Sequence, residues 1–231
     1  ICIFDILYLI FNFEMLYLVA TPIGNLKDIT LRAIEVLKKV NLIACEDTRH
    51  SRILLKSYGI DTPTTSYFQH NRFRKAKFLL GKLQDGLDVA LISDAGMPGI
   101  LDPGYHFINL AIENNISITV IPGATAFICA LVLSGKPAHK FIFDGFLSNK
   151  ASARCRRLKE LKACGITVIF YESPHRIMAA LKDVQDIFGD INIAVAREIT
   201  KHFEEVKRGR VSDIIQHFSR QKVRGEFVVV I

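Results

Sequence analysis

The sequence has 231 residues, which is enough for one large domain or two small ones. Half of the residues are hydrophobic and 23% are charged, which excludes a disordered chain and favours a folded globular protein. The 30 basic residues exceed the 23 acidic ones, and the resulting formal charge of +7 suits an anionic partner such as nucleic acid, although general solubility explains it equally well. The five cysteines form no Cys-x-x-Cys pair, and His and Cys nowhere recur at ligand spacing, so we predict reduced thiols, a cytoplasmic location and no metal site.

The first stretch, residues 1–14, is apolar enough to suggest a membrane segment. However, Asp5, Asn12 and Glu14 interrupt the apolar run, and neither a basic region nor a cleavage site of small residues accompanies it. The strand-like stretch LYLVATPIGN begins only after Met15. We therefore interpret residues 1–14 as an extension of unclear status, in preference to a membrane anchor.

From residue 16 onwards, short apolar runs rich in β-branched residues alternate with helical patterns. Residues 16–25 predict a strand followed by a Pro-Gly turn, and residues 30–40 predict a helix whose apolar side chains recur at helical spacing behind the N-cap Thr30. The other predicted elements of this half are strands at 41–47, 88–96 and 116–123, and helices at 51–60, 73–86, 104–115 and 125–135. This alternation predicts an α/β fold with a mainly parallel sheet and helices on both of its faces.

The pattern starts again near residue 138, where we place a domain boundary between an N-terminal α/β domain, 15–138, and a C-terminal one, 139–231. A helix at 174–189 is predicted to begin with Pro174 at its first position and to end on Gly189. The remaining elements are strands at 140–146, 166–173, 191–198 and 226–231, and helices at 152–164 and 212–220.

Three Gly/Pro-rich turns follow strands of the first half, at 22–25, 94–99 and 122–126. Ligands of open α/β sheets bind beyond the carboxyl ends of the strands, and small residues let a ligand approach the backbone closely. None of the turns is a P-loop or a dinucleotide-binding G-x-G-x-x-G. Each alone fits a tight turn, but three turns at one sheet edge predict a ligand site.

The stretch 44–52, ACEDTRHSR, concentrates polar side chains after the second strand. In a structural interpretation, Asp47 or Thr48 caps the next helix and Arg49 pairs with an acid. In a functional interpretation, the cluster forms the floor of a substrate cleft. The two interpretations are compatible.

Six motifs occur in the order and approximate spacing of one known family. They are LVATPIGNLKDIT, ACEDTRHS, LISDAGMPGILDPG, YESPHRI, REITKHFEEV and GEFVVVI. With these motifs the chain, from Met15 onwards, resembles the ribosomal small-subunit methyltransferase I family of the tetrapyrrole-methylase superfamily. The resemblance implies two α/β domains with a cofactor cleft between them, a homodimer, and S-adenosylmethionine-dependent 2′-O-methylation of a cytidine ribose in 16S rRNA of the small ribosomal subunit.

The resemblance also implies which residues bind the cofactor, largely through backbone groups. They are Pro22, Asp94, Ala95, Gly96, Ile100, Thr125 and Ala126 from the three turns, and Phe170, Tyr171, Ala196 and Ile199 from the second domain. S-adenosylmethionine is compact and carries a sulfonium, so close amide contacts and an apolar wall suit it better than a phosphate cradle. Methyl transfer removes that positive charge, so a pocket with little water favours the transition state.

The reaction also needs an acceptor for the proton of the attacking hydroxyl. The candidates are Asp47, Glu172 and Glu198 at strand ends, and Lys201 if its pKa were lowered; the sequence does not rank them. Basic side chains in these motifs and in two basic runs are predicted to contact RNA, with an intramolecular ion pair as the alternative for each. They are Arg49, His50, Arg72, Arg74, Arg154, Arg156, Arg157, His175, Arg176 and Arg197.

Two other functions compete with this hypothesis. A tetrapyrrole methyltransferase would share the fold and the cofactor, although the basic charge and the EDTRH motif argue against it. A catalytically inert RNA-binding assembly factor would bind no S-adenosylmethionine. A nucleotide-dependent oxidoreductase is disfavoured because the sequence contains no dinucleotide fingerprint.

Overall fold

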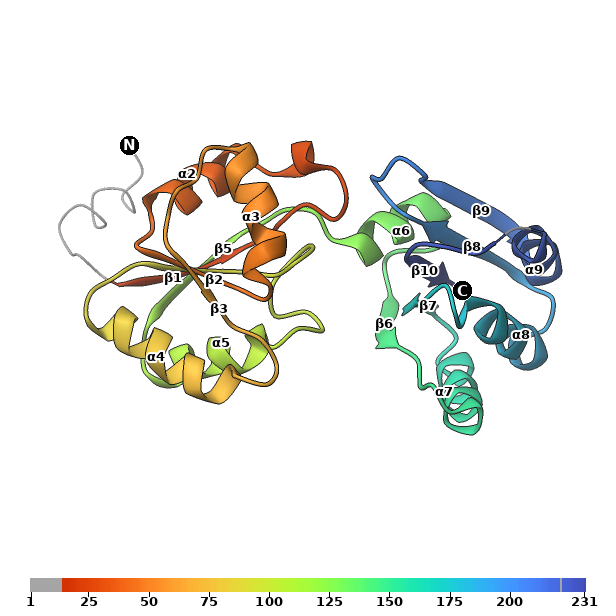
Figure 1. Ribbon diagram of the computed structural model, residues 1–231. Helices are drawn as coiled ribbons and strands as arrows, with labels where there is room; N and C mark the ends of the chain where they lie inside the picture. Colours follow the sequence, from red (N-terminus) through yellow and green to blue (C-terminus); the bar gives the residue numbers. More distant parts are fainter. Residues whose placement is uncertain (1–13, 221) are drawn as a thin grey trace. The chain divides into compact units, whose positions relative to one another are not determined.

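The computed structural model describes residues 14–220 and 222–231, which fold as two compact units that divide between Thr125 and Ala126 (Figure 1). Most of the extension predicted at the start of the chain, residues 1–13, lies outside the described residues. Helix α6 (Ala126–Ser134) packs on strands of the second sheet. It therefore belongs to the second unit, whereas the boundary predicted near residue 138 assigns it to the first.

The first unit contains a five-stranded parallel sheet in the order β3-β2-β4-β1-β5. Its strands are β1 (Met15–Val19), β2 (Leu42–Cys45), β3 (Thr64–Ser66), β4 (Val89–Ile92) and β5 (Ser117–Ile121). Its helices are α2 (Leu31–Lys39), α3 (Thr48–Ser57), α4 (Arg72–Gln84) and α5 (Gly104–Glu113), with a short 3-10 helix, η1 (Leu26–Asp28). Because all strands run in one direction, their carboxyl ends share one edge of the sheet.

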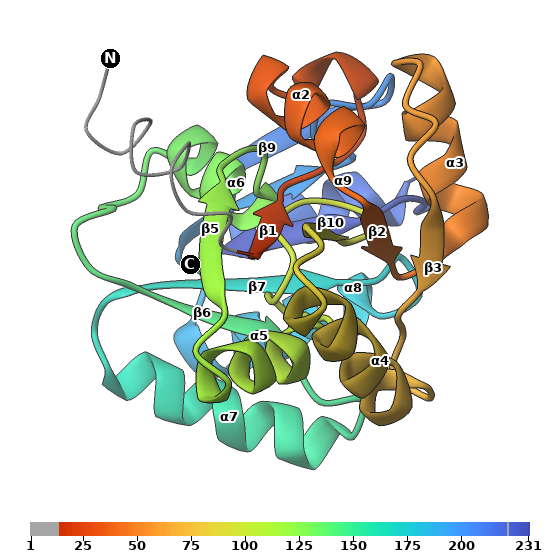
Figure 2. The same cartoon turned by 90° about the vertical axis from the view of Figure 1, so that its left-hand side faces the viewer.

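Both faces of this sheet are buried. Tyr17 and Val19 of β1 pack into a core with α2 and α3, while Leu16 and Leu18 pack into a second core with α4 and α5. Figure 2 shows the two helix pairs on opposite sides of the sheet. Burial on both faces explains why the strands read as continuous apolar runs in the sequence.

The second unit contains a five-stranded mixed sheet in the order β6-β7-β10-β8-β9. Its strands are β6 (Phe141–Phe146), β7 (Thr167–Glu172), β8 (Asn192–Arg197), β9 (Glu205–Arg210) and β10 (Phe227–Val230). Strand β6 is parallel to β7, but the other three pairings are antiparallel. The prediction of mainly parallel sheets is therefore confirmed for the first unit only. Helices α7 (Ala151–Ala163), α8 (Ile177–Phe188) and α9 (Val211–Ser219) pack over one face of this sheet, and α6 packs against the other.

Several local predictions can be compared with the structure. Thr30 caps α2, since its hydroxyl accepts a hydrogen bond of 3.1 Å from the amide of Ala33. Helix α8 begins only at Ile177, so the prediction that Pro174 starts it is wrong, and Pro174 lies in the preceding turn. Strands β3 and β9 have no counterpart in the sequence analysis because the first has three residues and the second is charged. No helix in the described parts of the chain is both long enough and apolar enough to cross a membrane.

Candidate active site

The turns that follow β1, β4 and β5 lie together at one edge of the first sheet. Thr21 and Gly96 form a two-way backbone bridge, in which the Thr21 amide donates over 2.9 Å and the Gly96 amide over 3.1 Å. Gly96 has a φ of +83°, and a Cβ at this position would lie 3.4 Å from Ile23 Cγ2 and 3.5 Å from the carbonyl oxygen of Ala124. All three Gly/Pro turns therefore meet around Gly96, as the sequence predicts.

Small residues are required where these turns touch. A Cβ at Gly123 would lie 2.8 Å from the Cβ of Ala20, and the Ala20 amide donates a hydrogen bond of 3.1 Å to the carbonyl of Ile121. Backbone groups at this edge thus stay bare of side chains, as a ligand held by amide and carbonyl contacts requires.

The loop after β4 is braced by the carboxylate of the half-buried Asp102. Asp102 Oδ1 accepts hydrogen bonds of 2.8 Å from the amide of Gly99 and 2.7 Å from the amide of Gly104. Burial raises the pKa of Asp102, and the two amides oppose that shift. Asp102 therefore holds the loop in shape from within.

Negative charge gathers at the same edge. Glu46 and Asp47 follow β2, and Asp94 Oδ1 accepts a hydrogen bond of 3.1 Å from the amide of Asp47. Burial raises the pKa of Glu46, and the carboxylates of Asp94 and Asp102 raise it further. The edge therefore favours a cationic ligand and disfavours a phosphate.

Asp47 lacks the proton affinity that a general base needs. Its carboxylate accepts hydrogen bonds from the Arg49 amide at 2.8 Å, from Arg49 Nε at 3.2 Å and from Arg49 Nη2 at 3.0 Å. The Arg49 side chain, followed by the Arg49 amide, lowers the pKa of Asp47 to about 2. The structure thus confirms the cap and the ion pair predicted for this cluster, while the Arg49 side chain stays 90% exposed.

The cofactor contacts predicted for the first unit all belong to these turns. They are Pro22, Asp94, Ala95, Gly96, Ile100 and Thr125. Pro22 and Gly96 are buried, whereas Ala95 and Ile100 are exposed. This difference indicates that the buried positions shape the edge, while the exposed positions are open to a ligand.

The contacts predicted for the second unit separate onto two faces of its sheet. Tyr171 and Ala196 both lie opposite Val228 of β10, and hence on one face. The ring of Phe170 is fully buried in the core beneath α7, α8 and α9, because neighbouring residues of a strand point to opposite faces, so only its backbone is left for the predicted cofactor contact. Ile199, which follows β8, is buried.

Tyr171 joins an aromatic cluster at the start of α6, the helix that Ala126 begins. Its phenol oxygen accepts a hydrogen bond of 3.3 Å from the amide of Phe127. The Phe127 ring stacks on Phe143 with 4.1 Å between centroids, and Phe143 and Phe146 meet the Tyr171 ring edge-on at 5.0 and 5.5 Å. Burial raises the pKa of Tyr171, so this residue stays neutral at physiological pH.

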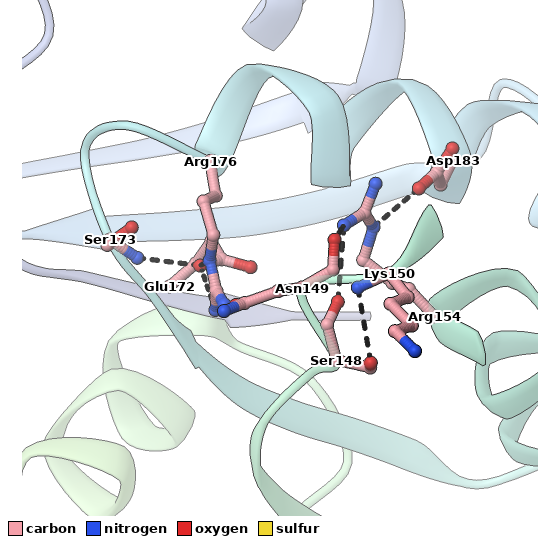
Figure 3. Close-up of polar contacts among 8 residues, drawn as sticks. All are labelled: Ser148, Asn149, Lys150, Arg154, Glu172, Ser173, Arg176 and Asp183. Carbon is pink, nitrogen blue, oxygen red and sulfur yellow. Dashed lines mark hydrogen bonds and ion pairs between the residues drawn. The ribbon is translucent and has the colours of Figure 1, made fainter. Parts of the chain in front are cut away.

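Glu172 is enclosed and tied to Arg176 (Figure 3). Glu172 Oε1 accepts hydrogen bonds from Arg176 Nε at 2.6 Å and from the Ser173 amide at 2.8 Å. The Glu172 side chain is 0% exposed, and its Oε2 has no hydrogen-bond partner among the described residues. A carboxylate enclosed in this way does not meet a substrate hydroxyl, which argues against Glu172 as the proton acceptor and commits Arg176 to an internal pair.

Glu198 and Lys201 form a second charged cluster, in the loop between β8 and β9. Lys201 Nζ lies 2.8 Å from Glu198 Oε1 and 2.9 Å from Glu226 Oε2. Burial opposes both charges, but the hydrogen bonds outweigh it, so the pKa of Glu198 is lowered and the pKa of Lys201 is raised. Lys201 therefore lacks the lowered pKa that a role as base requires.

Arg154, which was predicted to contact RNA, is instead an internal residue (Figure 3). Only 6% of the residue is exposed, and its Nε lies 2.5 Å from Asp183 Oδ2. Its Nη1 donates to the carbonyls of Ser148 at 3.2 Å and Asn149 at 3.4 Å. The prediction is corrected, because this guanidinium ties α7 to α8 and to the preceding loop.

Other predicted RNA contacts divide in the same way. Arg157 pairs with Asp144 at 2.6 Å, and Arg197 pairs with Glu205 at 3.4 Å. Within residues 14–220 and 222–231, the predicted contacts that form no ion pair are His50, Arg72, Arg74, Arg156 and His175. Ion pairing thus divides the predicted RNA contacts into arginines that have an acidic partner and side chains that have none among the described residues.

Two acidic residues of these clusters were missed as site candidates. In the sequence Glu46 stands out only as part of a polar stretch, and its pKa is raised because the fold buries it and brings Asp94 and Asp102 next to it. Glu226 was read as the start of the last strand, yet it completes the Lys201 cluster. The parallel order of β2 and β4 was the signal that could have found Glu46, whereas the pairing of Glu226 had no sequence signal. No group of three or more metal-ligating side chains is arranged to hold an ion in the described regions.

Comparison with known proteins assigns the chain to a family. Residues 15–215 match the model of one family, described as tetrapyrrole (corrin/porphyrin) methylases. Ribosomal RNA small subunit methyltransferase I of Synechocystis sp. is 49% identical over 94% of this chain and 78% of its own length. The protein of the same name from Thermotoga maritima is 44% identical over 94% of this chain and 97% of its own length. The chain belongs to the ribosomal RNA small subunit methyltransferase I family. The resemblance of its six motifs is therefore confirmed.

Solved structures agree on the fold of this family member. A cobalt precorrin-4 methyltransferase superposes with a TM-score of 0.71 at 14% identity, covering 94% of each chain. A diphthine synthase superposes with a TM-score of 0.72 at 13% identity, covering 94% of this chain and 89% of its own. At such low identity the likeness concerns the fold alone, and it confirms the predicted α/β class.

Membership of this methyltransferase family makes S-adenosylmethionine the cofactor. The edge of the first sheet fits that molecule in two respects. Its turns leave the backbone bare around Gly96 and Gly123, and its carboxylates at Glu46 and Asp94 attract a sulfonium and an ammonium group. That Pro22, Asp94, Ala95 and Gly96 hold the cofactor in this unit stays a prediction from the motifs.

Proposed function

We propose that this protein transfers a methyl group from S-adenosylmethionine to the 2′-hydroxyl of a cytidine in 16S rRNA of the small ribosomal subunit. The observation that carries the proposal is the identity of 44–49% along 94% of the chain with proteins named ribosomal RNA small subunit methyltransferase I. The methylated position and base follow from the resemblance of the motifs. The formal charge of +7 supports a polyanionic substrate.

S-adenosylmethionine supplies an electrophilic methyl group when it is bound. Transfer to the ribose oxygen would replace the carbon–sulfur bond by a carbon–oxygen bond, cancel the sulfonium charge and pass the hydroxyl proton to a base. The chain contributes by fixing both reactants and by excluding water, because charge disappears in the transition state. The braced loop after β4 suits that role, since Asp102 holds the loop in shape through its backbone amides.

The pKa values at this edge favour Glu46 over Asp47 as the acceptor of the proton. A general base works best when its pKa lies near the working pH, and Asp47 has a pKa of about 2. Burial, with Asp94 and Asp102, moves the pKa of Glu46 in the useful direction. The Glu46→Gln variant should therefore lose the acidic limb of the pH–rate profile, whereas Asp47→Asn should keep it.

The decisive experiment incubates purified protein with S-adenosylmethionine carrying a labelled methyl group and with small ribosomal subunits. The expected result is label on one ribose of 16S rRNA, mapped to a cytidine 2′-oxygen by nuclease digestion and mass spectrometry. Label on a base, or on no RNA, would overturn the proposal. Methylation of uroporphyrinogen in place of RNA would establish the tetrapyrrole alternative, and calorimetry that detects no cofactor binding would establish the inert assembly factor.

Two substitutions test the cofactor edge, with a matched control. Ala95→Leu adds bulk at an exposed position, so it should weaken S-adenosylmethionine binding without changing the melting temperature. Gly96→Ala and Gly86→Ala place a side chain at nearly the same φ, +83° and +82°, but a Cβ at Gly86 meets nothing within 4 Å. Both should therefore incur similar backbone strain, and only the Gly96 variant should lose cofactor affinity in calorimetry.

We also propose that the protein works as a homodimer in the bacterial cytoplasm. The resemblance to the family supports the dimer, and the bacterial relatives support the location. Light scattering on the purified chain tests the dimer, and a monomer at micromolar concentration would exclude it.

A further inference from the structure

We infer that one exposed side of helix α4 is a docking surface for an unpaired stretch of RNA, an inference that rests on the proposed function. The helix contains five basic residues, Arg72, Arg74, Lys75, Lys77 and Lys82, and no acidic one, although Lys82 pairs at 3.6 Å with Asp85 just beyond its end. It also carries two phenylalanines, Phe73 and Phe78, which are 61% and 45% exposed. Cations mixed with exposed rings distinguish this helix from an ordinary solvated one.

The rings and the cations form one continuous band. Residues three or four positions apart are neighbours on a helix surface, which places Lys77 beside Phe73 and Arg74, and Phe78 beside Arg74 and Lys82. The order across the surface is therefore Phe73, Lys77, Arg74, Phe78, Lys82. We call this set the α4 band.

The rings of the band are supported from within the first unit. Phe73 packs edge-on against His106 of α5, with 4.7 Å between centroids, and Arg72 Cζ lies 4.8 Å from the centre of the Phe73 ring. Lys75 Nζ and Lys82 Nζ lie 5.1 and 5.9 Å from the centre of the Phe78 ring. Figures 1 and 2 both show α4 and α5 side by side. The rings are thus held in place and still expose much of their surface.

A glycine opens the middle of this surface. Gly81 lies one turn beyond Lys77 and Phe78 inside α4, where glycine is unfavourable for a helix. A Cβ at Gly81 would meet nothing within 4 Å, so packing does not require the glycine. Its effect is to leave free space next to Phe78, into which a flat group can settle.

The charge of the α4 band indicates that its binding partner is a nucleic acid and not a second copy of the chain. A symmetric contact between two copies would place the cations of one α4 against those of the other, and this repulsion disfavours it. The phosphates of RNA are the complementary charge, and the release of their counterions favours binding.

The exposed rings indicate that the α4 band binds unpaired RNA in preference to duplex RNA. Bases within a duplex are already stacked and are not available to a side chain, whereas unpaired bases stack on exposed aromatic rings. A band in which cations alternate with rings offers phosphate contacts and base contacts to the same strand. The α4 band therefore fits a single-stranded segment of the substrate.

The test measures binding of an unstructured RNA of about 12 nucleotides, which carries the fluorescent base 2-aminopurine, and of the same RNA annealed to its complement. The double variant Phe73→Ala/Phe78→Ala should weaken binding of the unpaired RNA between about 5-fold and about 150-fold per lost stack. Quenching of 2-aminopurine should disappear with it. Leu31→Ala truncates a 79% exposed apolar side chain on α2 and is the matched control. It should change neither the affinity for the unpaired RNA nor the quenching of 2-aminopurine.

Salt titration separates the rings from the cations. Lys77→Gln should reduce the slope of log affinity against log salt by about 0.7, whereas the double phenylalanine variant should keep the slope and lose affinity at every salt concentration. Equal affinity of wild type and double variant, or equal binding of duplex and unpaired RNA, would overturn the inference. A double variant that dissociates a dimer while binding RNA normally would overturn it in favour of an interface between copies.

The same samples distinguish this inference from the proposed function. If the wild-type protein binds the unpaired RNA through the α4 band but transfers no methyl group to small subunits, the docking surface is supported and the proposed function is refuted. If the double phenylalanine variant methylates small subunits with an unchanged KM, the docking surface is refuted and the proposed function is supported.

Discussion

Replacing Arg154 by methionine tests whether this side chain braces the second unit or binds RNA. The change keeps the length of the apolar stem and removes the guanidinium. It deletes the ion pair to Asp183 and the hydrogen bonds to the carbonyls of Ser148 and Asn149. The Asp183 side chain is only 17% exposed, so its charge is left with little compensation from water.

The expected loss of stability follows from that burial. Removing one partner of a buried ion pair costs about 3–5 kcal/mol, because the other charge stays behind unpaired. For a protein of this size, about 1 kcal/mol corresponds to about 2–4 °C in melting temperature. We therefore expect Arg154→Met to melt about 6–20 °C below the wild type, if the chain unfolds in one step.

The neighbouring residue provides the control. Arg156 lies on the same helix, is exposed and forms no ion pair among the described residues. Arg156→Met should melt like the wild type and lose RNA affinity, whereas Arg154→Met should keep its RNA affinity at a temperature where it is folded. Circular dichroism and fluorescence anisotropy measure the two properties. The reasoning is refuted if Arg154→Met melts within about 1 °C of the wild type, which is the range of an ordinary surface change.

Three further substitutions have defined outcomes. The pKa of Asp47, about 2, lies below the pKa of an aspartate in an unfolded chain. The ionised carboxylate therefore stabilises the fold above about pH 4, and this contribution is lost as the pH falls towards 2. Between pH 6 and pH 3, the melting temperature of Asp47→Asn should therefore fall by less than that of the wild type. Gly81→Ala should raise the stability by about 1 kcal/mol in urea unfolding, since it meets open space in a helix, and a loss would show a packing role. Gly225→Ala should lower the stability by more than Gly189→Ala does. The two glycines have similar φ values, +89° and +84°, but only a Cβ at Gly225 would clash with Glu198. Equal melting temperatures of the two variants would contradict this.

The first sheet was predictable because its signals are local. Both faces of β1 are buried, so its residues form one apolar run, and Thr30 marks the start of α2. Parallel strands share their carboxyl edge, so three Gly/Pro turns in sequence become neighbours in space around Gly96. The meeting of the three turns at this edge was therefore predictable from the sequence, and a cofactor site there stays a prediction.

The roles of single charged residues were not predictable in this way. Arg154 and Arg156 are separated by one residue in a basic run, but two positions on a helix point in different directions, and only the first reaches Asp183. Glu172 and Lys201 acquire their partners from the fold, and their proton affinities depend on those partners. A sequence indicates which charges are present, whereas burial and pairing decide which of them reach a ligand.

The first unit keeps opposite charges apart in a chain whose overall formal charge is +7. A protein of charge +7 that binds RNA should repel a cationic cofactor, yet Glu46 and Asp94 gather negative charge at the edge of the sheet while α4 gathers positive charge. At physiological salt the screening length is about 8 Å, so each ligand responds mainly to the charges nearest to it. Salt should therefore weaken RNA binding steeply through released counterions and change cofactor binding little, because the cofactor meets only a few close carboxylates and bare backbone groups. The same screening allows one small α/β unit to present an acidic edge to a sulfonium and a basic, aromatic helix to a nucleic acid.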